Sequence, residues 1–178
     1  MWRKRGKAVQ DEDRIIKDAE KSRERTMNRA VKLLTAKQRS VAELRERLLE
    51  KAWTNFEIVD RVIEKLKEYG YLDDRKYASD LALSKLRQRP QGKRKLQQSM
   101  SQKKLDREIR DEAIVAALEK IPEADLIDRA IEKRLRLKGK PETREETKKF
   151  YDHLLRQGFD FDLIREKMSA VSKLETEE

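Results

Sequence analysis

Three stretches of the chain carry the same spacing of apolar residues, and this internal repeat constrains the fold more than any other feature of the sequence. The clearest copy covers residues 40–69, where apolar residues at helical spacing lie on both sides of Trp53. A shift of 52 residues again finds apolar residues at equivalent positions: Leu96, Met100, Leu105, Ile114 and Leu118. A shift of 106 residues does the same: Phe150, Leu154, Leu155, Phe159, Ile164 and Met168. Such a period indicates one small unit stacked several times.

Each copy contains two predicted helices joined by a tight turn, and a third predicted helix precedes each copy, over residues 26–37, 74–88 and 123–137. We therefore predict an all-α fold, a tandem repeat of three-helix, helix-turn-helix-like modules over residues 26–72, 73–121 and 122–174. Residues 1–25 form a charged N-terminal segment that we expect to be partly helical. Because no Ser/Gly-rich linker separates the modules, we expect elongated or curved stacking.

Helix-start and helix-stop signals agree with these limits. Three hydroxyl residues precede a glutamate at capping-box spacing: Ser40 with Glu43, Thr54 with Glu57, and Thr143 with Glu146. Asp106 and Asp160 follow the apolar turn residues of the second and third copies and are predicted N-caps. Gly70 is predicted to end a helix in the left-handed conformation. The aromatic turn residues Trp53 and Phe159 are interpreted as packing between two helices.

The composition excludes several classes of protein. The 178 residues include no cysteine, which excludes disulfides and thiolate metal sites and fits a reducing compartment. No apolar run approaches the roughly 18 residues that a membrane span needs. The basic start of the chain, residues 1–5, lacks the apolar stretch of a signal peptide. We therefore expect a cytoplasmic protein without a membrane partner.

No residue pattern indicates catalysis. The only histidine, His153, lies on an amphipathic helix without His or Cys neighbours, so we interpret it as a surface or boundary residue. The acidic pairs at 73–74 and 145–146 are helix-start carboxylates. Nucleotide-binding and nucleophile-elbow motifs are absent. We expect no catalytic residues, no bound cofactor and no metal, and hence a protein that is not an enzyme.

Positive charge is concentrated in the middle of the chain. The formal net charge is +10, and residues 75–110 hold 12 Lys or Arg against 3 Asp or Glu. A solvated helix face is the simple interpretation, but so large an excess on one small module favours a surface that binds a phosphate backbone or an acidic protein groove. The candidate binding residues all come from this stretch: Arg87, Arg89, Lys93, Arg94, Lys95, Lys103, Lys104, Arg107 and Arg110.

Several segments resemble the RecX family of recombination regulators. The run 69–78, YGYLDDRKYA, resembles the junction signature of that family, roughly [LY]-G-[LY]-[LI]-[ND]-D-x-x-[FY]-A. Residues 40–48, SVAELRERL, resemble its S-x-x-E-L-x-x-K-L stretch, and residues 90–96 resemble its G-x-x-[RK]-[IL] segment. The resemblance covers about residues 26–170. Where the family often has glycine before the apolar turn residue, the chain has Ala52, Lys104 and Gly158.

The resemblance implies a fold and a function. RecX proteins are all-helical tandem three-helix repeats that lie along the groove of the RecA–DNA filament. They modulate, and mostly inhibit, its strand exchange, ATPase and coprotease activities, and so affect DNA repair, recombination and the SOS response. The implied partners are the RecA filament and single- and double-stranded DNA, and the basic middle module would face them. We expect the chain itself to be a monomer.

Another function is compatible with the same residues. A three-helix module with a basic second or third helix can insert into a DNA groove, so the chain could be a DNA-binding protein of tandem helix-turn-helix type that acts without RecA. A membrane-surface helix within residues 1–25 is a weaker alternative, because its apolar stripe is thin.

Overall fold

The computed structural model describes residues 14–173, and all regular structure in this range is helical. The helices of these residues are α1 (Ala19–Ala36), α2 (Val41–Leu49), α3 (Phe56–Glu68), α4 (Asp74–Gln88), α5 (Lys93–Ser101), α6 (Arg107–Lys120), α7 (Glu123–Lys138), α8 (Arg144–Arg156) and α9 (Phe161–Lys173). The predicted all-α class is confirmed. The chain forms two compact units: unit 1 is the chain up to Tyr77 with Lys103–Leu105, and unit 2 is Ala78–Gln102 with the chain from Asp106 onward.

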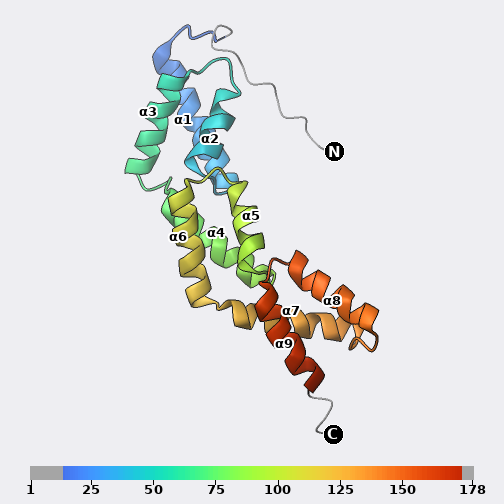
Figure 1. The fold of residues 1–178 in the computed structure, drawn as a ribbon. Coiled ribbons are helices and arrows are strands. Elements are labelled where there is room, and N and C mark those ends of the chain that lie inside the picture. Colours follow the sequence, from blue (N-terminus) through green and yellow to red (C-terminus); the bar gives the residue numbers. More distant parts are fainter. Residues whose placement is uncertain (1–13, 174–178) are drawn as a thin grey trace. The chain divides into compact units, whose positions relative to one another are not determined.

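Unit 1 is a bundle of α1, α2 and α3, which lie side by side in Figure 1. Its core contains fully or almost fully buried apolar side chains from all three helices and from the segment after them: Ala30, Leu44, Leu48, Val59, Val62, Ile63, Leu66 and Leu72. On α3 these residues recur every three or four positions, which gives the helix one wide apolar face. The repeat pattern thus corresponds to the buried face.

The first helix begins earlier than the sequence predicts. It starts at Ala19, so it includes part of the predicted N-terminal segment, and the Asp18 carboxylate accepts hydrogen bonds from the first-turn N–H groups of Glu20 and Lys21. Residues 14–18 are not helical, and the part of the N-terminal segment over residues 1–13 lies outside the described residues. Arg14 instead donates from Nη1 to the carbonyl oxygens of Leu49, at the end of α2, and of Lys51 and Thr54, in the connection between α2 and α3.

The capping predictions are confirmed at most positions. The capping boxes at Ser40 and Thr143 are both complete, and Asp106 and Asp160 accept first-turn N–H groups. Gly70 has φ 71° and closes α3, with Tyr71 N–H donating to the Leu66 carbonyl.

The capping box predicted at Thr54 with Glu57 is wrong. The Thr54 side chain is fully buried, and Thr26 Oγ1 donates to its hydroxyl at 2.9 Å. Asn55 caps α3 instead and accepts from the Ile58 N–H at 2.9 Å. The hydroxyl is taken by a partner from α1, a contact that local spacing cannot reveal.

Unit 2 contains the rest of α4 together with α5 to α9. Helices α5 and α6 pack on each other, and α9 packs on α7 and α8. The third repeat copy supplies Phe150, Leu154, Phe159 and Ile164, all at most 2% exposed, so the prediction that Phe159 packs between helices is confirmed. No helix among residues 14–173 combines the length and the apolar character that a membrane crossing requires.

Candidate anion-binding surface

The N-terminal turn of α2 contacts the turn that follows α5, an arrangement we call the α2 contact. Ser40 Oγ donates to the Lys103 carbonyl at 2.7 Å, while the same oxygen caps α2. Lys103 Nζ lies 3.3 Å from Glu43 Oε1, and Lys104 pairs with Glu46. Lys103 and its partner are only 22% and 21% exposed. These contacts all lie within unit 1 and use lysines predicted to bind a ligand.

The N-terminal turn of α5 contacts the turn that follows α8 in the equivalent way, here called the α5 contact. Gly92 N–H donates to the Gln157 carbonyl at 2.9 Å, and Arg94 N–H donates to the Gly158 carbonyl at 3.3 Å. Lys95 Nζ donates to Gln157 Oε1 at 2.9 Å. A Cβ at Gly92 would lie 2.2 Å from the Gly158 carbonyl oxygen, so the close backbone approach requires glycine.

Four of the nine predicted cations have acidic partners. Besides Lys103 and Lys104, Arg107 and Arg110 both pair with Asp111. Hydrogen bonding from Arg110, followed by the charge of that residue and of Arg107, holds the pKa of Asp111 below its ordinary value. These four cations are therefore weaker candidates for recognising a ligand than their sequence position indicates.

Four of the predicted residues remain open to solvent. Arg87 and Arg89 lie at the end of α4, and Lys93 and Arg94 lie at the start of α5. All four are exposed, and among the described residues none has a side-chain hydrogen bond or ion pair. The Glu123 carboxylate contacts only the backbone N–H of Lys93, at 2.9 Å. This group of residues, the α4–α5 patch, keeps its full positive charge.

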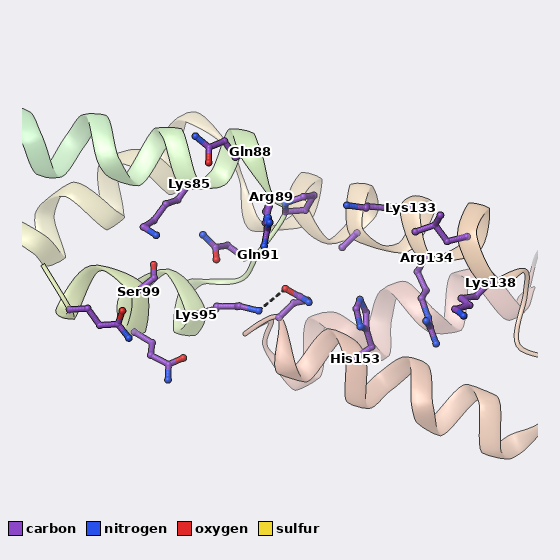
Figure 2. A pocket seen from close by; sticks show the side chains of 16 residues that line it. Lys85, Gln88, Arg89, Gln91, Lys95, Ser99, Lys133, Arg134, Lys138 and His153 are labelled. Atoms are coloured by element: carbon purple, nitrogen blue, oxygen red, sulfur yellow. Dashed lines mark hydrogen bonds between the residues drawn. The ribbon is translucent and has the colours of Figure 1, made fainter. Parts of the chain in front are cut away.

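A cavity of about 810 Å³ in unit 2 brings further cations together with part of this patch. We call it the basic cavity; α4, α5, α7 and α8 flank it. Its basic lining residues are Lys85, Arg89, Lys95, Lys133, Arg134 and Lys138. Figure 2 shows Lys85, Arg89 and Lys95 towards one end, the three α7 cations towards the other, and His153 between the two groups.

Three of these cations were missed from the sequence. Lys133, Arg134 and Lys138 belong to the third module, where 13 Lys or Arg are nearly balanced by 11 Asp or Glu, so a search by net charge passes over them. They share one face of α7 with Ala130 and Leu137, since these five positions follow each other at helical spacing. That basic face, interrupted by exposed Leu137, was the available signal.

Burial and the cations around the cavity lower the pKa of the only histidine of the chain. His153 lines the basic cavity from α8. Partial burial lowers the pKa of His153, and the positive charges of Arg134, Arg156 and Lys95 lower it further. The imidazole is therefore neutral at physiological pH. Among residues 14–173 no group of three or more His, Asp or Glu side chains could hold a metal ion.

Family models match the chain in three consecutive parts. The first three-helix domain of RecX matches residues 27–66, the second residues 73–114 and the third residues 122–168. Each match lies inside one predicted module.

Full-length relatives agree with these matches. The regulatory protein RecX of Prosthecochloris aestuarii is 31% identical over 83% of this chain and 93% of its own length. That of Chlorobium limicola is 34% identical over 80% of this chain and 86% of its own length. The crystal structure of RecX from Lactobacillus salivarius superposes with a TM-score of 0.74 at 19% identity, over 86% of this chain and 98% of that one. The structural likeness supports the fold.

Proposed function

The chain belongs to the RecX family of regulatory proteins, and from this membership we propose that it binds the RecA–DNA filament in its groove and inhibits the filament's recombinase, ATPase and coprotease activities. The protein acts by occupying RecA rather than by catalysis, and it works in the cytoplasm as a monomer. The observation that carries the proposal is the match of all three RecX domains in their family order along one chain.

The α4–α5 patch is the proposed contact surface. Its four cations are exposed and unneutralised by carboxylates among the described residues, whereas Lys103, Lys104, Arg107 and Arg110 have acidic partners. Free surface cations supply long-range attraction to a polyanion such as a DNA-containing filament. Within the basic stretch of the sequence, Lys93 and Arg94 are therefore the side chains whose charge reversal should matter most.

The test is a RecA strand-exchange assay with RecA ATPase measured in parallel. The wild-type chain should inhibit both activities, and Lys93→Glu with Arg94→Glu should weaken inhibition at least tenfold in the concentration required. The matched control reverses two exposed cations of α8, Arg144→Glu with Lys148→Glu, and should inhibit like wild type. No effect of the wild-type chain on RecA contradicts the proposed function; full inhibition by the α5 variant contradicts only the surface.

The alternative of a tandem helix-turn-helix DNA-binding protein rests on the same two side chains. Lys93 and Arg94 lie in the first turn of α5, and in helix-turn-helix proteins the first turn of the recognition helix contacts base edges. Tight binding to bare duplex DNA, combined with an unchanged RecA ATPase, would favour this alternative.

A further inference from the structure

The basic cavity is lined by several cations and by no carboxylate. No Asp or Glu lines it, although six Lys or Arg side chains do. The side chains of Lys133 and Lys138 form no ion pair or hydrogen bond among the described residues. The Lys95 ammonium contacts a neutral amide, and Arg134 lies over the ring of Phe150, 5.6 Å from its centroid. A concave site lined by one sign of charge concentrates the field and attracts the opposite charge.

The distribution of the cations indicates an extended anion. Lys85 and Arg89 come from α4, Lys95 from α5, and the remaining three from two successive turns of α7 (Figure 2). A single phosphate could contact only a few of these side chains at once, and it would fill a small part of about 810 Å³. A double helix is also unsuitable, because its rigid backbones run on the outside of a rod too wide for a cavity flanked by four helices. A flexible chain of phosphates fits both facts.

The neutral lining groups distinguish nucleic acid from bare phosphate chains. Five glutamines and Ser99 line the cavity, and they offer hydrogen-bond acceptors as well as donors. Inorganic polyphosphate has little to donate near neutral pH, whereas sugars and bases carry N–H and O–H donors. No Phe, Tyr or Trp is among the lining residues, so base stacking is not the main source of affinity.

We propose that the basic cavity holds the phosphodiester backbone of single-stranded nucleic acid, with little preference for base sequence. The inference deepens the proposed function and rests on it for the presence of a DNA strand. It also extends the proposed binding surface to the third module, whereas the sequence-based prediction placed all binding residues in the second. Lys133 and Lys138 would contact phosphates, and the glutamine amides would bond to sugars and base edges.

His153 allows occupancy to be measured directly, because it is the only histidine of the chain and lines the cavity. Proton NMR of its imidazole follows its titration with and without a 20-nucleotide single strand at low salt. Phosphates beside the ring favour the imidazolium form, so binding should raise the pKa of His153 by about one unit. Binding of the strand without any change in this titration would show that the cavity is not the site.

A pair of matched variants tests the contribution of the cations to binding, with the affinity for a labelled single strand measured by fluorescence anisotropy. Lys133→Gln with Lys138→Gln should weaken binding about tenfold and reduce the salt slope by about 1.4, since each single-strand phosphate contact contributes about 0.7. Arg144→Gln with Lys148→Gln, on exposed α8 positions that do not line the cavity, should leave both quantities unchanged. Circular dichroism confirms that both variants are folded. Equal losses in the two variants would contradict the proposal.

Competitors distinguish the sources of negative charge. The single strand should raise the pKa of His153 at lower concentrations than duplex DNA, ATP, inorganic polyphosphate or polyglutamate. An equal or stronger response to any of these overturns the assignment to single strands. Because RecA is absent from these measurements, their failure would leave inhibition of RecA untouched, and a failure to inhibit RecA would leave the cavity result standing.

Discussion

The α2 contact and the α5 contact occupy equivalent places in the repeat but are built from opposite chemistry. In the first, a serine hydroxyl and the Glu43 carboxylate meet the Lys103 backbone and ammonium. In the second, glycine meets glycine, and Lys95 on the helix meets a neutral glutamine. The two copies therefore make the contact at the same place. At the α2 contact a carboxylate pairs with the lysine, whereas at the α5 contact Lys95 meets only a neutral amide.

The two contacts can also be compared by the backbone conformation of the turn residue in each. Lys104 has φ 55°, the only non-glycine residue with positive φ in the part of the chain that the structure describes, and the equivalent Gly158 has φ 86°. The second and third copies therefore share a left-handed turn residue, although the second has lysine there in place of glycine. The difference is that Lys104 can still approach Glu46, whereas a side chain at Gly158 would collide with Lys95.

Adding one methyl group to the α5 contact should have the largest effect. Gly92→Ala places a Cβ against the Gly158 carbonyl, and we expect a loss of about 3 kcal/mol in the stability of unit 2, measured by urea unfolding followed by circular dichroism. Ser40→Ala at the equivalent position keeps its Cβ and loses hydrogen bonds only, about 1 kcal/mol. Equal losses at the two positions would refute the difference between the contacts.

High pH should weaken the α2 contact. Burial, followed by the charge of Glu43, raises the pKa of Tyr77 to about 12, and its hydroxyl lies 3.4 Å from Glu43 Oε2. The native state then keeps its proton where the unfolded state loses it, so stability falls as pH rises from 10.0 to about 12, by about 2 kcal/mol. Urea unfolding of wild type and Tyr77→Phe across this range measures the effect, and an identical slope in both would contradict it.

Substitutions at Lys104 should reveal the cost of its backbone conformation. Lys104→Gly and Lys104→Ala both remove the ion pair with Glu46, so the difference between them reports the left-handed φ. We expect the glycine variant to be more stable by about 1 kcal/mol in urea unfolding. A more stable alanine variant would show that the turn relaxes to another conformation.

Double-mutant cycles should show a smaller difference, in coupling free energy, between the side-chain pairs of the two contacts. The pair Glu43–Lys103 is charged and four-fifths buried, so its coupling should be about 1 kcal/mol, measured with Glu43→Gln and Lys103→Met. The pair Lys95–Gln157 joins a charge to a neutral amide, and its coupling should be about 0.5 kcal/mol, measured with Lys95→Met and Gln157→Ala. A stronger coupling for the second pair would reverse the comparison.

Acid should weaken unit 2 slightly, the opposite of the alkaline effect on unit 1. Because the pKa of His153 is below its ordinary value of 6.5, the unfolded state binds a proton first as pH falls, and stability is lost from about that pH downward. Comparing wild type with His153→Gln between pH 7.5 and 5 isolates the contribution. A loss of equal size in the variant would assign the acid effect to other groups.

Much of the candidate surface could be predicted from residue types and spacing, but its effective charge could not. The sequence placed nine cations in one stretch, and the exposed ones, such as Lys93 and Arg94, remain candidates. Lys103 and Lys104 were misleading because their partners, Glu43 and Glu46, lie about 60 positions away in the chain. Lys133 and Lys138 were missed because the near-neutral net charge of their module hides a basic helix face.

The sequence by itself determined the all-α class, the three repeats and most helix ends. Apolar spacing and capping residues act within a few positions of each other in the chain, so their effects can be predicted from the order of the residues alone. Tertiary structure alone decided that Thr54 is buried against α1, and which cations have acidic partners. Those outcomes depend on contacts between distant segments, where a carboxylate brought beside a lysine, or a cavity formed by several helices, changes what a residue can do.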